Sequence, residues 1–257
     1  MFFYKSNMFD TSDIERMETA HPLTFWENVR HNTRWGQYIH SIEERAFHIA
    51  LRAAQRPSVA LEIGSEGGYW TRHLVERDWE VICTDVDEEA LELCRKRVPS
   101  ATHVHVSPDS TTLPCASGTV GLLVCFEVFP VINSTWFVAE ANRVLSGGGV
   151  LVGVTQNRKS IRSVVAKFLH IVDGTRKASF DNRHLYTFTY EDWKNQVTQR
   201  GLSVIHEEGM CWLPFQRKSN FFLIPHLTRL EKHMGLRDIP ELSPWIAFVA
   251  QKRYVSE

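Results

Sequence analysis

The sequence lacks the patterns that mark several large protein classes. It has no run of eighteen apolar residues, so we expect no membrane-spanning helix. The opening segment Met1-Phe-Phe-Tyr-Lys5 is too short for a secretory signal, and polar residues follow it at once. Neither charge is in excess, because 29 basic residues face 30 acidic ones. A net charge of −1 gives no general attraction to nucleic acid, so we expect none as a partner.

Metal-binding motifs are also missing. The 5 cysteines include no C-x-x-C pair, and the 12 histidines form no H-E-x-x-H set, so we predict no metal site. Cys83 and Cys125 lie in apolar strand patterns, where cysteine packs as a small hydrophobic residue. Free thiols suit a reducing compartment, and we therefore expect a cytoplasmic protein.

The most informative segment runs from Val59 to Asp85. The apolar run Val59–Ile63 predicts a buried parallel strand, and Gly64, Gly67 and Gly68 in the following turn allow positive φ angles. A helix from Tyr69 and a second strand, Val81–Thr84, come next, and that strand ends at Asp85. A strand, a glycine turn, a helix and an acid after the second strand are typical of a nucleoside-cofactor site in an α/β sheet.

The glycine pattern limits the choice of cofactor. A G-x-G-x-x-G dinucleotide motif starting at Gly64 would need glycine at Glu66 and Tyr69. A carboxylate at Glu66 would also repel a pyrophosphate. No Gly-Lys-Ser/Thr follows the turn, which excludes a phosphate-binding P-loop. The residues thus favour a ligand with an adenosine-like ribose and no phosphates.

Later segments extend this pattern. The turn Glu62-Ile-Gly-Ser-Glu-Gly-Gly68 resembles the E/D-x-G-x-G-x-G motif of class I S-adenosylmethionine-dependent methyltransferases of the small-molecule branch. Segments similar to the later family motifs follow in the same order, at Asp85, 107–114, 120–128 and 143–152. The resemblance spans about half of the chain. It implies S-adenosylmethionine as cofactor and S-adenosylhomocysteine as product.

The resemblance also implies roles for individual residues. Asp85 matches the acid that binds the ribose hydroxyls, and Asp109 matches the acid that accepts the adenine amino group. Phe126 would contact the sulfonium, although a core position is an equal alternative. Glu66 replaces the family's central glycine, so either the turn differs or its carboxylate meets the cofactor ammonium. The implied cofactor-binding residues are Glu62, Gly64, Ser65, Glu66, Gly68, Asp85, Val86, Asp109, Ser110 and Phe126.

Alternating strand and helix patterns fill residues 58–156, with one helix near 133–145, and predict right-handed βαβ units. We also expect Asp87 to cap one helix, and Thr189 and Asp192 to form the capping box of a helix that ends at Gly201. With two later strands, at 202–206 and 245–251, the resemblance implies an α/β fold. This is a doubly wound, mostly parallel seven-stranded sheet with an antiparallel last strand, N-terminal helices and a C-terminal cover. We assign residues 1–56 to an N-terminal helical lid and 57–257 to a Rossmann-like domain. Within this domain we expect acceptor-covering insertions at about 157–188 and 208–243.

The function predicted from this pattern is methyl transfer by in-line displacement to a small-molecule acceptor, with a hydrophobic or lipid-linked acceptor as an open alternative. No histidine of the family motif carries over as a base, because Pro130 stands at that position. His184, Tyr186 and Glu127 remain weak catalytic candidates. Other readings are a non-catalytic cofactor-binding relative and, less favoured, an NAD or nucleotide-sugar enzyme. We expect a monomer or homodimer, with interfacial membrane contact through apolar segments as an open alternative.

Overall fold

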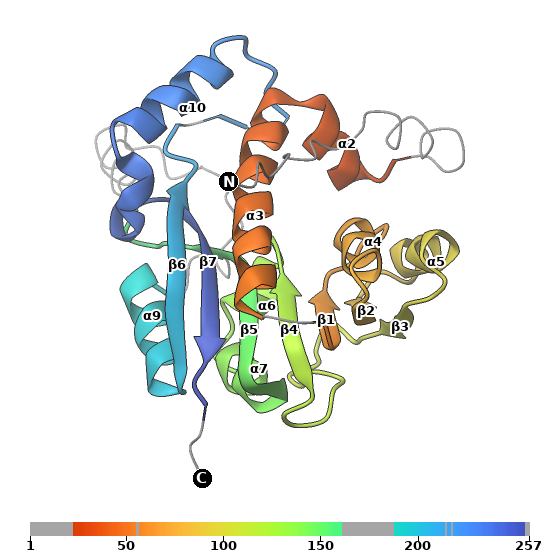
Figure 1. Ribbon diagram of the computed structural model, residues 1–257. Coiled ribbons are helices and arrows are strands. Elements are labelled where there is room, and N and C mark those ends of the chain that lie inside the picture. The colour runs from red at the N-terminus through yellow and green to blue at the C-terminus, as the bar shows by residue number, and fades with distance from the viewer. Residues whose placement is uncertain (1–22, 55–56, 161–187, 214, 217, 255–257) are drawn as a thin grey trace, which may run out of the picture.

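The computed structural model describes residues 23–54, 57–160, 188–213, 215–216 and 218–254. A seven-stranded sheet with the order β3-β2-β1-β4-β5-β7-β6 forms its centre (Figure 1). The strands are β1 Val59–Ile63, β2 Glu80–Asp85, β3 Thr102–His105, β4 Val120–Cys125, β5 Leu145–Gln156, β6 Leu202–Met210 and β7 Trp245–Lys252. The helices are α2 Phe25–Asn32, α3 Arg34–Ala53, α4 Tyr69–Val75, α5 Glu88–Arg97, α6 Phe129–Ile132, α7 Phe137–Val144, α9 Tyr190–Gln199 and α10 Ile224–His233, with short 3₁₀ helices η1 Leu236–Asp238 and η2 Pro240–Leu242.

Strand directions confirm the predicted sheet. β3, β2, β1, β4 and β5 pair in parallel. The last strand, β7, runs antiparallel to both β5 and β6. The sheet is therefore mixed, with six strands in one direction and one reversed, and helices cover it on both sides.

The central strands are mostly apolar because both faces are covered. Residues 122–125 of β4 are completely buried, as expected for a parallel strand between two helical layers. α3 crosses one face of the sheet (Figure 1) and packs on β5, β6 and β7. Its side chains Ile42, Ala46 and Phe47 belong to the same hydrophobic core as the strands.

Two predicted helix starts are confirmed. Asp87 caps α5, and its carboxylate accepts from the amides of Glu89 and Ala90. Thr189 and Asp192 form the predicted capping box of α9. In both cases a short polar side chain satisfies amides that the first turn of a helix leaves unpaired.

The helix predicted near 133–145 is present as α7, but it begins at Phe137 rather than at 133, and a separate short helix, α6, ends at Ile132. Asn133 ends α6, and its side chain accepts a hydrogen bond from the buried Thr155 hydroxyl at 2.8 Å. The Ser134 hydroxyl then accepts from the amide of Phe137, the first residue of α7. Local side-chain bonds thus replace the helical ones across 133–136.

The connection from β6 to β7 holds α10, η1 and η2 and lies above the sheet, beside the start of α3 (Figure 1). Buried polar contacts attach it to the rest of the chain. The Tyr38 hydroxyl donates to Glu231 at 2.6 Å. The Arg237 guanidinium joins Glu231 at 3.2 Å to Glu208 at 3.1 Å. Helix α10 is therefore tied to α3 and to β6 by directional bonds.

The two ends of this connection lie side by side. Met210 at the end of β6 is paired with Trp245 at the start of β7. The buried Ser243 hydroxyl lies 2.9 Å from the Met210 carbonyl and 2.7 Å from that of Trp245. The base of the connection is thus closed by the sheet itself.

One prediction lies mostly outside the described residues. Of the expected insertion at 157–188, the structure describes 157–160 and 188 alone. Within the described part of the chain, no helix has the length and apolar character needed to cross a membrane.

Candidate functional site

The glycine turn after β1 is tightly folded against β2 and β4. The amides of Gly64 and Ser65 both donate to the Thr84 carbonyl, at 2.8 and 3.0 Å. Gly64 has φ +73°, and a Cβ at this position would lie 2.5 Å from Val128 Cγ2. Gly68 also has a positive φ, of +88°. These two positions therefore need glycine, as the sequence predicted. The same prediction was wrong for Gly67, which does not have a positive φ.

Glu66 occupies the glycine position of the motif and takes a glycine-like conformation. Its φ is +47°, in the left-handed region that non-glycine residues rarely adopt. Its amide donates to Asp85 at 2.8 Å, and its carboxylate accepts from the amide of Trp26 at 3.2 Å. Burial raises the pKa of this carboxyl group. Glu66 thus joins the turn to the first turn of α2, a contact that sequence reasoning missed.

Asp85 lies where the sequence predicted, at the end of β2 beside the glycine turn. Its two carboxylate oxygens accept one backbone amide each, from Glu66 at 2.8 Å and from Asp87 at 3.0 Å. The side chain is half-buried. A carboxylate has about four lone-pair positions, so it retains capacity for two further donors.

Glu62 faces α4, away from the backbone amides of the turn. The side chain is 2% exposed and accepts from the Thr71 hydroxyl at 2.5 Å. Burial raises the pKa of this carboxyl group well above its ordinary value. The structure thus gives Glu62 a place in the packing of β1 against the first turns of α4.

The remaining predicted cofactor residues follow the ends of β1, β2 and β3. Ser65 is buried, and its hydroxyl makes no hydrogen bond within the described residues. Val86 is 53% exposed next to Asp85. The amide of Val106 donates to the Asp85 carbonyl, which brings the start of the 106–114 loop to this edge. Further along that loop Asp109 is exposed and Ser110 half-buried.

Phe126 and Glu127 follow β4 at the same edge of the sheet. Phe126 is 8% exposed, and its ring centroid lies 4.8 Å from that of Trp70, so it packs in the core. Glu127 has φ +56° and lines a small cavity of about 30 Å³. That cavity is enclosed mainly by α2 and α3, through residues Trp26, Val29, Arg30, Gly36, Ile39, His40 and Glu43.

Arg30 and the residues around Tyr69 form a part of the site that the sequence did not reveal. The Arg30 guanidinium lies 4.2 Å from the centre of the Tyr69 ring. Its Nη1 is buried and makes no hydrogen bond within the described part of the chain. His40 Nε2 is 2.8 Å from the Tyr69 hydroxyl. Burial, together with the nearby Arg30 charge, lowers the pKa of His31 to about 4, so this ring is neutral at pH 7.

Of the three catalytic candidates, the structure describes only Glu127. His184 and Tyr186 lie outside the described residues. Glu127 lines the same cavity as Arg30, so a carboxylate and a guanidinium lie at one cavity.

Comparison with known proteins gives one family and many structural neighbours. Residues 61–153 match the family described as "Methyltransferase domain". A SAM-dependent methyltransferase from Methanosarcina mazei aligns at a TM-score of 0.54 and 15% identity, over 81% of this chain and 97% of that one. An S-adenosylmethionine-dependent methyltransferase from Mesorhizobium loti aligns at 0.52 and 16% identity, over 80% and 98%.

A third neighbour is a Haloferax volcanii protein solved in complex with the Trm112 methyltransferase activator. It aligns at a TM-score of 0.52 and 13% identity, over 85% of this chain and 94% of that one. No curated protein sequence matches the chain. The predicted resemblance and fold are confirmed, and S-adenosylmethionine is the cofactor that the family match implies.

Proposed function

We propose that the chain transfers the S-adenosylmethionine methyl group to a small-molecule acceptor, because residues 61–153 match a methyltransferase domain and the sheet has the seven-stranded fold of the structural neighbours. The observation that carries the proposal is the set of free polar positions at the glycine turn. Asp85 retains lone pairs there, and the buried Ser65 hydroxyl has no partner within the described residues. Leaving such a hydroxyl unpaired costs free energy, which a bound ligand would recover.

The nucleoside part of the cofactor fits these residues. Asp85 would accept the two ribose hydroxyls, because two of its lone-pair positions are not used by Glu66 and Asp87. The exposed Val86 side chain offers an apolar surface for the adenine ring. Asp109, on the loop that starts beside Asp85, would accept the adenine amino group.

The amino-acid end of the methionine part would lie at the cavity that α2, α3 and Glu127 line. Its carboxylate would bind the Arg30 guanidinium, whose buried Nη1 makes no hydrogen bond within the described part of the chain. Its ammonium would bind Glu127, which lines the same cavity. Two opposite charges on one cavity suit a zwitterion, since charged hydrogen bonds are roughly twice as strong as neutral ones.

When bound, the cofactor supplies an electrophilic methyl group, so the chain's own residues need to align the acceptor and exclude water. Alignment of two reactants accounts for about 7–11 kcal/mol of barrier lowering. α2 is placed for this role, because Glu66 connects it to the glycine turn and Glu27 connects it to Arg97 of α5. His184 and Tyr186 remain the candidates for a base toward a hydroxyl acceptor, because Glu127 is assigned to the cofactor ammonium.

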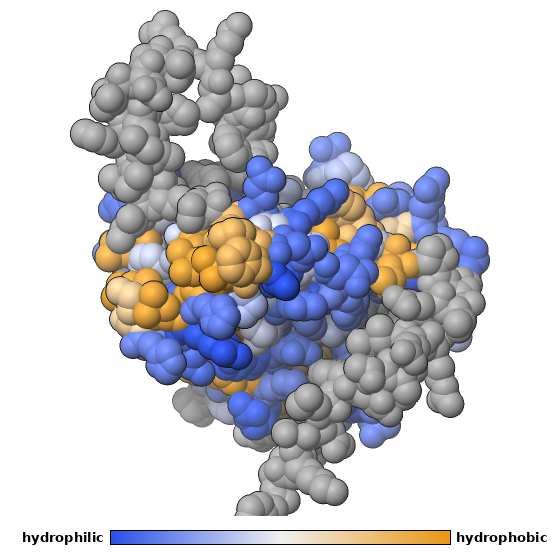
Figure 2. Space-filling model, turned by 90° about the horizontal axis from the view of Figure 1, so that it is seen from above, coloured by the Kyte–Doolittle hydropathy of each residue, from blue (hydrophilic) through white to orange (hydrophobic). Residues whose placement is uncertain are grey.

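Exposed aromatic residues support a hydrophobic acceptor. Hydrophobic residues gather in patches on the face at the α2 and α10 end of the molecule (Figure 2). Phe25 is 52% and Phe222 65% exposed. The segment carrying Phe222 packs on α2, since Asn220 bonds to Asn32 and Lys218 lies 4.4 Å from the Phe25 ring. Apolar patches of this kind mark binding sites for ligands or membranes.

Calorimetric titration with S-adenosylmethionine and S-adenosylhomocysteine tests the cofactor assignment. We expect micromolar binding that Asp85→Ala weakens at least tenfold. Asp87→Ala is the matched control, because it removes a neighbouring carboxylate that caps α5. Equal affinity in all three proteins would remove Asp85 from the site, and absence of binding by the folded chain would overturn the proposal.

Arg30→Met tests the methionine pocket, with Arg34→Met as control at an exposed position of α3. We expect Arg30→Met to weaken the binding of S-adenosylhomocysteine. The affinity for 5′-methylthioadenosine, which lacks the amino-acid end, should stay unchanged. An equal loss of affinity for both ligands would contradict the assigned contact between Arg30 and the cofactor carboxylate.

The alternative of a degenerate, non-catalytic site rested on Glu66. In the structure Glu66 adopts the positive φ of a glycine, and its carboxylate is bonded to α2. Glu66→Gly distinguishes the two cases. An increase in cofactor affinity above tenfold would favour a site that Glu66 obstructs, whereas we expect a small decrease from the loss of the α2 contact.

A further inference from the structure

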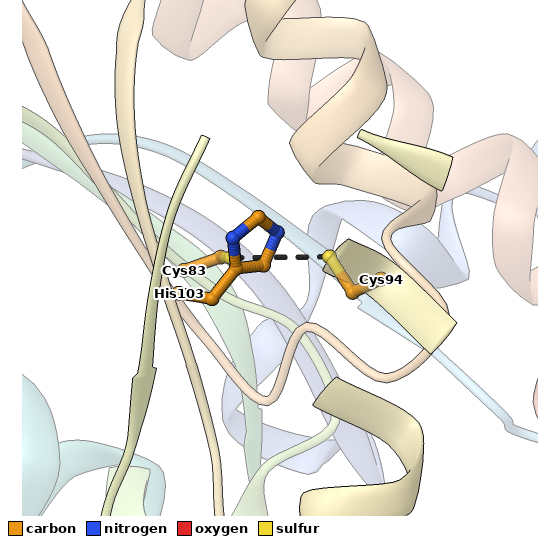
Figure 3. A group of neighbouring side chains, drawn as sticks. All are labelled: Cys83, Cys94 and His103. Atoms are coloured by element: carbon orange, nitrogen blue, oxygen red, sulfur yellow. Dashed lines mark hydrogen bonds between the residues drawn. The ribbon is translucent and has the colours of Figure 1, made fainter. Parts of the chain in front are cut away.

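Two cysteines and a histidine meet on the outer side of the sheet. Cys83 lies on β2, and its partner across the parallel β2–β3 ladder is His103. Register partners point to the same face of a sheet. Cys94 lies on α5, which packs against β2 and β3 and brings its thiol to this face. In Figure 3 the three side chains point toward one another from these three elements.

The distances suit a common metal ion. The two sulfur atoms are 3.8 Å apart. A tetrahedral zinc ion with Zn–S bonds of about 2.3 Å holds two sulfurs about 3.8 Å apart, whereas a disulfide needs about 2.05 Å. All three ligand atoms, including the histidine nitrogen, lie within 4.8 Å of one another. Small side-chain rotations would bring that nitrogen to bonding distance.

The surroundings favour a soft cation. Cys83 and Cys94 are completely buried, and Nε2 of His103 is buried as well. Thiolate and imidazole ligands select zinc and copper(I) over magnesium or calcium. The Thr71 hydroxyl is 3.7 Å from the Cys94 sulfur and is the nearest further oxygen recorded for this thiol. A water or this hydroxyl would complete four-coordination.

We propose that Cys83, Cys94 and His103 form a zinc site. The ion would join β2, α5 and β3, and it would lie behind the glycine turn, because a Cβ on Gly68 would approach the Cys94 sulfur to 2.8 Å. Binding would therefore fix α5 and the Gly68 position together. The site uses none of the residues assigned to the cofactor except Gly68, and it stands independently of the methyl-transfer proposal.

Cobalt(II) titration of the full-length protein tests the site, because thiolate ligands give intense sulfur-to-cobalt absorption and tetrahedral cobalt has strong visible bands. We expect one equivalent of cobalt to bind with both signals, and zinc to displace it. Cys94→Ser should reduce the thiolate absorption by half or more, and Cys94→Ser and His103→Asn should each weaken zinc affinity at least tenfold.

Cys115→Ser and His105→Asn are the matched controls, since Cys115 is half-buried outside the cluster and His105 is exposed on the same strand as His103. We expect both controls to bind like the wild type. Thermal unfolding with and without zinc is a second measurement, which applies even if a variant folds poorly. Zinc should raise the melting temperature of the wild type and of both controls, but not of Cys94→Ser.

Three outcomes would overturn the proposal. The first is a weak cobalt spectrum of the octahedral type. The second is an equal loss of zinc affinity in the cluster variants and in the controls. The third is a protein that binds copper(I) but not zinc. The last result would keep the cluster as a metal site but would reject zinc as its ion.

Discussion

The ion pair between Arg97 and Glu27 allows a quantitative prediction about how α2 is held. Arg97 Nη1 lies 2.8 and 2.9 Å from the two Glu27 oxygens and 3.1 Å from the Gly67 carbonyl. The two side chains are 6% and 2% exposed. The pair thus connects α5, the glycine turn and α2 inside the protein, where solvent screening is weak.

Arg97→Met would leave the Glu27 carboxylate buried without its counter-charge. Removal of one partner from a buried pair costs about 3–5 kcal/mol. Glu27 keeps its bond from the amide of Thr24 at 2.8 Å, so we expect a loss near the lower limit, about 3 kcal/mol. With an m value of about 3 kcal/mol/M, the urea midpoint should fall by about 1 M.

Urea unfolding of four proteins checks this value. Arg95→Met is the matched control, because Arg95 pairs with Glu92 on the exposed side of the same helix, and it should change stability by less than about 0.5 kcal/mol. The double variant Arg97→Met/Glu27→Gln should recover at least about 1 kcal/mol of the free energy of unfolding that Arg97→Met loses. Equal midpoints for Arg97→Met and Arg95→Met would refute the reasoning.

Three further predictions concern the turn, a helix cap and acid stability. Gly64→Ala places a methyl group 2.5 Å from Val128 Cγ2 at φ +73°; we expect loss of cofactor binding by calorimetry together with a lower melting temperature. Thr189→Ala removes the cap of α9 and should cost about 1 kcal/mol in urea unfolding. Burial lowers the pKa of His31 to about 4 and that of His73 to about 3. Since the unfolded rings titrate near pH 6.5, stability should fall as pH drops from 6.5 toward 4, and His31→Gln/His73→Gln should reduce that loss.

The parts of the fold that depend on local pattern were predictable from the sequence. Continuous apolar runs such as Val120–Cys125 predict buried parallel strands, and Asp87 and Thr189 predict helix starts from single side chains. The break between α6 and α7 was not predicted, because it depends on Asn133 bonding to Thr155 on another strand. Local pattern carries no information about such a partner.

The same limit applies to the site. Asp85 was found because it follows a strand and a glycine turn at a known spacing, and the structure brings it to that turn. Arg30 was missed because its position depends on how α2 packs against Tyr69, 39 residues away in the sequence. The cysteine–histidine cluster had one usable signal, the alignment of β2 with β3, which makes Cys83 and His103 neighbours.

The paired ends of the β6–β7 connection have a consequence for how the protein could be altered. Met210 and Trp245 are held together by the sheet, and Ser243 closes the base of the connection. A segment that leaves and re-enters at one fixed point can change in length without separating the strands, because loop closure depends weakly on length. Residues 211–242 are therefore a natural unit for exchange between relatives. Chimeras joined at Met210 and Ser243 would vary the surface above the sheet while the glycine turn and Asp85 keep their positions.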